Sequence, residues 1–182
     1  ITHIGFGLVL KKNGKKFKTR SGKTIKLITL INKAIKKSKK LIKNKNIKIN
    51  NKDLYNKAKT IGINAIKYTD LSYNIINSYR FCYKKMLKYE GNTSTFVIYA
   101  YCRIVSIQKK IGKNINIIKN KNKFKITNKD EEKIAFLICQ FYENIEYVID
   151  KIVPQKLTNY LYNISEKFHQ YFHKYKIKNT KE

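Results

Sequence analysis

Residues 128–154, which read NKDEEKIAFLICQFYENIEYVIDKIVP, decide the fold class of this chain. Their apolar residues recur at intervals of three and four positions, which predicts an amphipathic helix. These residues are Ile134, Leu137, Ile138, Phe141, Ile145, Val148 and Ile149. Asn128 or Asp130 can cap the start of the helix, and an acidic first turn suits its positive end. Pro154, the only proline in the chain, marks the break that follows.

Similar patterns lie on both sides of this stretch. Residues 155–175 predict a last helix, and its inward positions are Leu157, Leu161, Ile164, Phe168 and Phe172. Upstream, residues 91–93 predict the start of another helix, with Asn92 or Thr93 as its N-cap and Gly112 as its C-cap. The sequence therefore predicts a mostly α-helical bundle.

The first part of the chain has a different pattern. Residues 4–10 indicate a short buried strand, and residues 11–23 form a loop rich in lysine and glycine. Residues 25–42 then show roughly helical spacing, with apolar side chains at Leu27, Ile28, Leu30, Ile31, Ala34 and Ile35. We expect a short α/β remnant of another domain ahead of the bundle.

Polar or irregular segments connect these elements. A stretch rich in lysine and asparagine, residues 43–52, predicts a linker or surface loop. A helix is expected at 54–68, followed by irregular connections at 71–81 and 113–127. The bundle therefore begins near residue 54.

Charge is the most unusual feature of the composition. The 182 residues include 41 basic and 11 acidic side chains, a formal net charge of +30. Lysine-rich composition from AT-rich codons accounts for part of this excess, but so positive a field attracts polyanions, and nucleic acid is the first partner to consider. The hydrophobic fraction of 42% excludes wholesale disorder. No apolar run approaches the ~20 residues that a membrane span needs, so we expect no membrane partner.

Three further groups of side chains are candidate sites. The loop around Lys16, Lys18 and Arg20 suits a polyphosphate, although a solvated turn is the simpler interpretation. Tyrosines among lysines suit stacking on unpaired bases, or packing within the bundle. His169 and His173 have a metal-binding spacing but no evident third ligand, so surface histidines are expected there. Finally, the widely spaced Cys82, Cys102 and Cys139 indicate buried structural thiols in a reducing compartment.

Taken in order, the segments resemble the C-terminal part of an arginyl-tRNA synthetase over nearly the whole chain. Residues 3–10 resemble the strand before that family's signature loop, and 16–22 (KFKTRSG) resemble its degenerate Lys-Met-Ser-Lys-Ser loop. Residues 24–34 resemble the segment that follows the loop. Residues 64–68 (NAIKY) fall at the Asp-Ala-Leu-Arg motif, and residues 91–103 and 160–165 resemble two helices of the same bundle.

The resemblance implies a fold, a division into domains and a reaction. The fold is mostly α, with a helical-bundle anticodon-binding domain preceded by a short α/β remnant of a Rossmann-type catalytic domain. Residues 1–42 would end the catalytic domain, and residues 54–182 would form the anticodon-binding domain, incomplete at its C-terminus. The family joins arginine to its tRNA through arginyl-adenylate, with ATP as substrate and magnesium accompanying it. No resident metal or organic cofactor is expected.

The resemblance also implies particular site residues. Lys16, Lys18, Thr19 and Arg20 would close over ATP as catalytic residues, with Ser21 also contacting the nucleotide. Tyr99 and Arg103, on the long helix after residue 93, are the expected contacts with the arginine tRNA.

Several properties depart from the family pattern or lie outside the chain. Thr19 stands where class I loops usually have a second lysine, and Asn64 and Lys67 replace the acid and the arginine of the naming motif. The His-Ile-Gly-His element and the arginine pocket would precede Ile1, so we expect no arginine activation by this chain alone. A monomer is expected, in the cytoplasm or a plastid-like organelle. The alternative function is a stand-alone basic helical RNA-binding module without catalysis.

Overall fold

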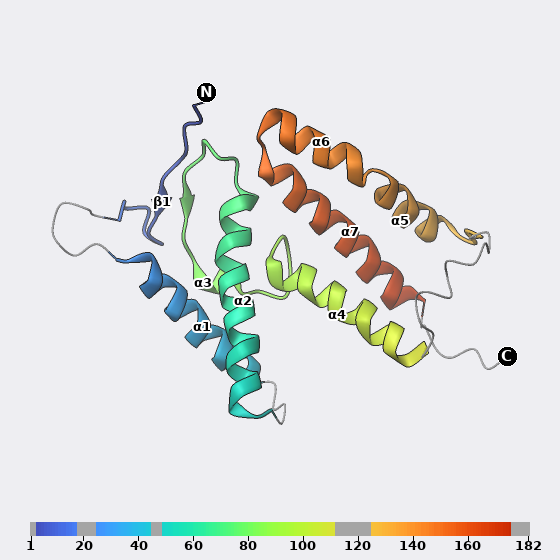
Figure 1. Cartoon of the computed structure of the whole chain (residues 1–182), viewed down its shortest axis with the longest axis horizontal. Helices are drawn as coiled ribbons and strands as arrows, with labels where there is room; N and C mark the ends of the chain where they lie inside the picture. The colour runs from blue at the N-terminus through green and yellow to red at the C-terminus, as the bar shows by residue number, and fades with distance from the viewer. Residues whose placement is uncertain (1–2, 18–24, 45–48, 112–124, 176–182) are drawn as a thin grey trace.

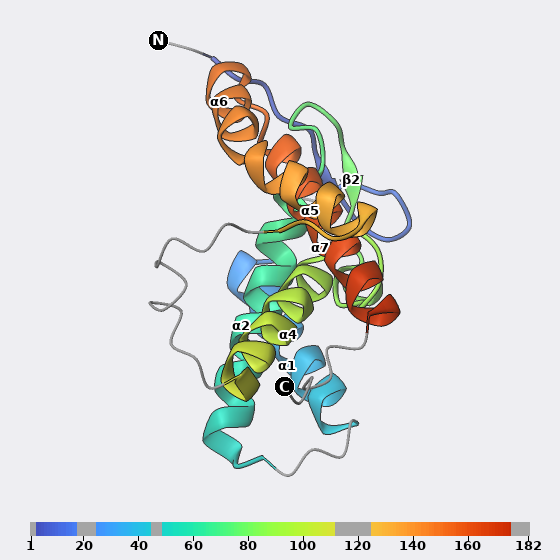
Figure 2. The ribbon, with the colours of Figure 1, turned by 90° about the vertical axis from the view of Figure 1, so that its right-hand side faces the viewer.

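A computed structural model describes residues 3–17, 25–44, 49–111 and 125–175 of the chain. It is mostly helical, as the sequence predicts (Figure 1). The helices form two groups, one near the N-terminus and one near the C-terminus. Helix α2 belongs to the first group and contacts α4 and α7 of the second, and in Figure 2 α4 lies in front of it.

Two long helices form the N-terminal group. Helix α1 (Leu27–Lys43) packs along α2 (Asn51–Ser72), and small side chains line the contact. A Cβ added to Gly62 would lie 2.8 Å from the backbone nitrogen of Ile35, so only glycine allows this close approach. Helix α2 begins earlier than predicted because Asn50 caps it, accepting a hydrogen bond from the backbone N–H of Asp53 at 2.8 Å. The helix also extends past residue 68 to Ser72.

A small parallel sheet lies beside these helices. It pairs β1 (Val9–Leu10) with β2 (Tyr79–Arg80), and β2 falls within residues 71–81, where an irregular connection was expected. The prediction of a buried strand over residues 4–10 is wrong, because only two residues are strand and Phe6 is 79% exposed. Within the described residues the pairing with β2 covers only Val9 and Leu10, so residues 4–8 form no strand.

The core of the N-terminal part forms where the sheet meets α2 and the short helix α3 (Tyr83–Met86). Its buried members are Ala65, Tyr79, Phe81, Met86 and Leu87. A second cluster of Ile42, Leu54 and Ala58 joins α1 to α2. The helix over 25–42 is confirmed, but Leu27 and Ile28 are exposed at its start.

Four helices form the C-terminal group: α4 (Ser94–Ile111), α5 (Lys129–Cys139), α6 (Phe141–Lys151) and α7 (Pro154–Lys174). Thr93 precedes α4, and its hydroxyl accepts a hydrogen bond from the backbone N–H of Phe96 at 3.2 Å. The single helix predicted over 128–154 is instead two helices, which meet at Gln140. Both helices contact α7, and Figure 1 shows them running along it.

The predicted ends of these helices are largely confirmed. Asn128 caps α5, accepting hydrogen bonds from the backbone N–H groups of Asp130 and Glu131, each at 3.0 Å. Pro154 begins α7, after Ile152 adopts a left-handed conformation with φ of 53°. The predicted C-cap Gly112, and residues 112–124 of the predicted connection, lie outside the described residues.

The predicted inward face of α7 is wrong in part. Its apolar positions, such as Leu157 and Phe168, are half-buried, whereas Thr158, Tyr160, Ser165 and His169 are buried. Helix α7 contacts α2, α4, α5 and α6. Its buried positions hold polar side chains, and each of these side chains has a hydrogen-bond partner. The cysteine prediction is also wrong, since Cys82 is half-buried and Cys102 and Cys139 are exposed.

Candidate functional site

The described base of the predicted ATP loop is a tight turn at the end of β1. The backbone N–H of Lys11 donates to the carbonyl of Lys15 at 2.8 Å, and Leu10 forms an antiparallel bridge with Lys16. Gly14, with φ of 79°, allows the turn because its conformation is one that side chains rarely adopt. The exposed Lys16 therefore stands at the foot of the loop, whereas Lys18, Thr19, Arg20 and Ser21 lie outside the described residues.

A second cation lies at this turn. Arg80, at the end of β2, places its guanidinium 3.6 to 3.8 Å from the position that a Cβ on Gly14 would occupy. The carboxyl ends of parallel strands are a common place for ligands in α/β folds, because loops from neighbouring strands converge there. Sequence analysis missed Arg80, because a two-residue strand leaves no periodic signal.

Tyr99 and Arg103, the predicted tRNA contacts, lie together on α4. The Arg103 guanidinium donates to the Tyr99 hydroxyl at 2.9 Å and lies 4.3 Å from the Tyr99 ring centroid. The same guanidinium lies 4.5 Å from the ring centroid of Phe172 on α7. Arg103 thus contacts two aromatic rings, and Tyr99 stays 43% exposed.

Two histidines of α7 complete this cluster. Arg103 Nη1 lies 2.9 Å from Nδ1 of His169 and 3.4 Å from Nε2 of His173. Since guanidinium only donates, Nδ1 of His169 accepts, and its Nε2 can donate to the carbonyl of Phe96 at 3.4 Å. Burial, followed by the charge of Arg103, lowers the pKa of His169. The expectation of surface histidines is therefore wrong for His169, which is 7% exposed and serves the contact between α4 and α7.

The motif at residues 64–68 contributes a bridge between helices. The hydroxyl of Tyr68 lies 2.6 Å from Oδ1 of Asn92 and 2.9 Å from the carbonyl oxygen of Thr158. Asn92 in turn donates to Oδ1 of Asn159 at 3.0 Å. Burial raises the pKa of Tyr68 to about 12, so its hydroxyl stays protonated and donates at neutral pH. The motif thus fixes α2 against the start of α4 and α7.

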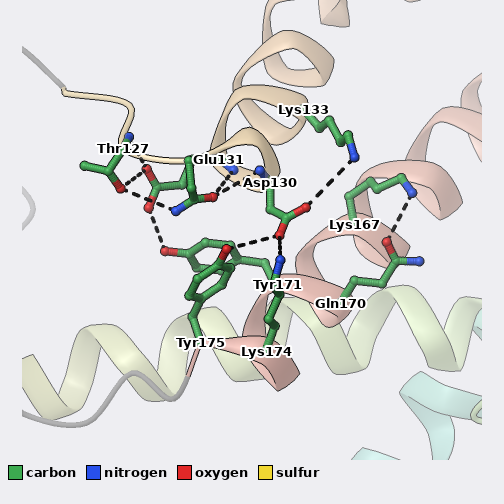
Figure 3. Close-up of polar contacts among 10 residues, drawn as sticks. Thr127, Asp130, Glu131, Lys133, Lys167, Gln170, Tyr171, Lys174 and Tyr175 are labelled. Carbon is green, nitrogen blue, oxygen red and sulfur yellow. Dashed lines mark hydrogen bonds and ion pairs between the residues drawn. The ribbon is translucent and has the colours of Figure 1, made fainter.

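Acidic side chains at the start of α5 are bound to the end of α7 (Figure 3). Asp130 accepts a hydrogen bond from Lys174 Nζ at 2.7 Å, which lowers its pKa. Glu131 accepts from the hydroxyl of Tyr171 at 2.9 Å and from the backbone N–H of Thr127 at 2.8 Å, and these bonds lower its pKa. The acidic first turn therefore joins two helices in addition to matching the helix dipole.

Charge is distributed unevenly along the chain. Residues 127–182 contain nine basic and eight acidic side chains, whereas residues 1–126 contain 32 basic and three acidic ones. The positive field therefore belongs to α1, α2, α4 and the segments that connect them. Such a surface favours phosphate contacts.

The described residues contain no candidate metal-ligating cluster and no candidate membrane-spanning helix. No group of three histidine, cysteine, aspartate or glutamate side chains there is arranged to hold a metal ion. In the same part of the chain, no helix has both the length and the apolarity to cross a membrane.

Two family models match the chain in sequence. The catalytic domain of class I tRNA synthetases (R) matches residues 1–83, and the DALR anticodon-binding domain matches residues 97–182. Helix α2 and the motif at 64–68 fall within the first match. The position of the predicted boundary between 42 and 54 remains a prediction.

Relatives in sequence and structure agree with these matches. The chain is 38% identical over 180 residues to an arginine–tRNA ligase of Protochlamydia amoebophila, covering 99% of the chain and 31% of the relative. It is 46% identical over 183 residues to the arginine–tRNA ligase of Buchnera aphidicola subsp. Cinara cedri, covering 100% of the chain and 32% of the relative. The chain thus spans about a third of the length of these relatives.

Among solved structures, the arginyl-tRNA synthetase of Plasmodium falciparum superposes with a TM-score of 0.80 at 29% identity, covering 97% of this chain and 29% of that one. The synthetase of Thermus thermophilus shares the fold at 19% identity, with a TM-score of 0.77 and coverage of 98% and 28%. The catalytic segment, followed by an anticodon-binding bundle, defines a class I tRNA synthetase. The chain belongs to the arginyl-tRNA synthetase family.

Proposed function

We propose that this chain works as part of an arginine–tRNA ligase, contributing the loop that closes over ATP and the bundle that holds the arginine tRNA. The whole enzyme joins arginine to tRNA through arginyl-adenylate, consuming ATP and releasing pyrophosphate. One observation carries the proposal: a catalytic match over residues 1–83 is followed by an anticodon-binding match over 97–182. A stand-alone RNA-binding module is not favoured, because it gives no reason for the first match.

The ATP part of the proposal concerns the loop after β1. Lys16, Lys18, Thr19 and Arg20 act on the polyphosphate, their cations offsetting the charge that develops during nucleotidyl transfer, and Ser21 adds a hydroxyl contact. Magnesium accompanies the nucleotide. The exposed position of Lys16 at the foot of the loop and the Arg80 guanidinium near Gly14 support this assignment, since both bring positive charge to the turn.

The tRNA part concerns the exposed ring of Tyr99. A base of the tRNA stacks on Tyr99, while Arg103 holds the ring in place and adds positive charge. The packing of Arg103 against the rings of Tyr99 and Phe172 supports a preformed aromatic platform.

Competition between tRNAs tests this function. Binding of the chain to an arginine tRNA transcript is compared with binding to another tRNA of equal length, from roughly 50 to 300 mM salt. We expect a preference for arginine tRNA that persists at high salt, because base contacts survive when phosphate contacts are screened. Equal binding at every salt concentration would contradict the proposal and favour the RNA-binding module.

A variant pair tests the platform. Tyr99→Ala is expected to weaken arginine tRNA binding about tenfold, the loss of one stacked base. Tyr142→Ala is the matched control, because Tyr142 is an exposed tyrosine on α6, in the part of the chain with balanced charge. Equal effects of the two changes would remove Tyr99 from the interface.

We also propose that the chain is a monomer, in the cytoplasm or a plastid-like organelle. Light scattering at several protein concentrations tests the first point, and a constant mass of one chain is expected. Fluorescence microscopy of the tagged full-length gene product tests the second.

A further inference from the structure

A groove of about 590 Å³ lies between α1 and the segment that follows β2, and its lining shares no residue with either site described above. This volume is typical of pockets that enclose small organic molecules. One wall is the C-terminal half of α1, and the other is α3 with the residues that follow it.

The rim of the groove is strongly basic on both sides. Lys37 and Lys40 project from α1, and Lys84 and Lys88, one helical turn apart in sequence, stand on the opposite wall. All four side chains are exposed. The ion pairs found in the described part of the chain join Asp130 to lysines elsewhere, so none of them involves these four. Glu90 is the one acidic side chain among the described lining residues.

The floor of the groove is apolar and rigid. Leu41 and Leu87 contribute aliphatic surface, and Tyr83 contributes an aromatic ring. The Tyr83 hydroxyl donates to the carbonyl of Leu30 at 3.1 Å, and its ring packs edge-on against Phe81 with centroids 4.9 Å apart. Lys37 Nζ lies 5.8 Å from the centroid of the Tyr83 ring, so cation and ring belong to one surface.

We propose that this groove binds a segment of single-stranded RNA, with a base against the Tyr83 and Leu87 floor and backbone phosphates between the two lysine rows. Aromatic floors flanked by cations are how proteins hold unpaired nucleic acid without reading its sequence. An acidic peptide would use the lysines but has no flat ring for the floor. A membrane would need apolar side chains that protrude, and those of the groove are recessed. The choice of RNA over DNA rests on the proposed function. Binding of nucleic acid in the groove is independent of the proposed contact at Tyr99.

Charge removal at the rim tests the proposal. A fluorescent single-stranded RNA of 12 mixed-sequence nucleotides is titrated with the chain, and anisotropy gives Kd across a salt series. The triple variant Lys37→Gln, Lys84→Gln, Lys88→Gln is expected to raise Kd at least tenfold. It is also expected to lower the slope of log Kd against log salt by about 2, the value for three lost phosphate contacts on a single strand.

The control removes the same charge from the same half of the molecule. Lys52, Lys57 and Lys59 are exposed on α2 and do not line the groove. Their triple change to Gln is expected to alter Kd less than threefold. The midpoint of thermal unfolding is measured for both variants, and a midpoint equal to that of the wild type shows that they fold. Equal losses in the two variants would overturn the proposal, because a diffuse lysine field would then explain the binding.

Cross-linking and competition identify the occupant. RNA carrying 4-thiouridine is expected to cross-link to the peptide that contains Tyr83, and cross-links confined to other peptides would overturn the proposal. Polyglutamate that competes as well as RNA would also overturn it, in favour of any polyanion. Equal binding of single-stranded DNA would overturn the assignment to RNA. If cognate tRNA preference is absent while the groove variant still loses RNA, the proposed function fails and the groove stands.

Discussion

The contact between α1 and α2 and the contact between α4 and α7 hold neighbouring helices together in different ways. Helices α1 and α2 meet through small residues, with Ala34 and Ala58 almost fully buried and Gly62 against the backbone of α1. Helices α4 and α7 meet through large polar side chains, above all Arg103 and His169. The first contact is close and apolar, and the second is hydrogen-bonded and charged.

This difference has consequences for stability and for function. A close apolar contact is sensitive to volume, because no side chain can move aside to admit an extra methyl group. A polar contact is sensitive to lost partners and to protonation, because unpaired buried groups are costly. It also leaves Tyr99 exposed next to Arg103, at the place where we propose that a base of the tRNA stacks.

The largest expected effect comes from enlarging the close contact. Gly62→Val should destabilise the chain by about 3 kcal/mol, because the new side chain would collide with the backbone of α1 at Ile35. Urea unfolding followed by circular dichroism measures the change. Thr60→Val, at an exposed position of the same helix, is the control and should stay within about 0.5 kcal/mol. A loss no larger than that of the control would show that α1 moves aside freely.

Removing one hydroxyl from the bridge between the two helix groups should have a smaller effect. Tyr68→Phe is expected to destabilise by about 1.5 kcal/mol, because the carbonyl of Thr158 and the side chain of Asn92 lose a shared donor. The same unfolding assay measures it. Tyr55→Phe, at a half-exposed position of the same helix, is expected to change little. Similar values for the two variants would mean that the bridge does not hold α2 to α7.

Helix caps allow the two groups to be compared directly. Asn128→Ala should cost about 1 kcal/mol, since two backbone N–H groups of α5 lose their acceptor. Asn50→Ala removes one such bond from α2 and should cost less. Differential scanning calorimetry of both variants checks the order, and the reverse order would contradict it.

Mild acid should weaken the contact between α4 and α7. The pKa of His169 is lower in the folded chain than in the unfolded one, so the unfolded chain binds more protons at pH below about 6.5. Stability from this group is complete above that pH and is lost as pH falls toward the folded pKa. We expect the urea midpoint to fall between pH 7.5 and 5.5, and to fall less in His169→Gln. An identical pH dependence in the variant would assign the loss to other groups.

Much of the helical architecture follows from local sequence. The period of apolar residues in 128–154 correctly predicts helical structure there. Asn128 correctly predicts where α5 begins and Pro154 where the helical stretch is interrupted, because these signals act within a few residues. The earlier start of α2 could also have been predicted from the sequence, since Asn50 followed by Asp53 is a capping pattern. The break between α5 and α6 at Gln140 could not have been predicted, because the apolar period continues through it.

The candidate sites divide in the same way. The order of motifs in the sequence identifies the family and predicts the ATP loop, whose residues 18–21 lie outside the described part of the chain. The pairing of β1 with β2 joins residues 70 positions apart, and it brings Arg80 to the loop. Two-residue strands have no period to detect, so only the fold shows this neighbour.

The sequence by itself determined the helices, the excess of positive charge and the family, because propensity, caps, composition and motif order are local or additive properties. The tertiary structure alone decided which polar side chains are buried. His169 looks like a surface residue on its own helix, and becomes a buried partner of Arg103 because α4 packs against it. The groove between Lys37 and Lys84 likewise exists only because α1 and α3, some forty residues apart, lie side by side.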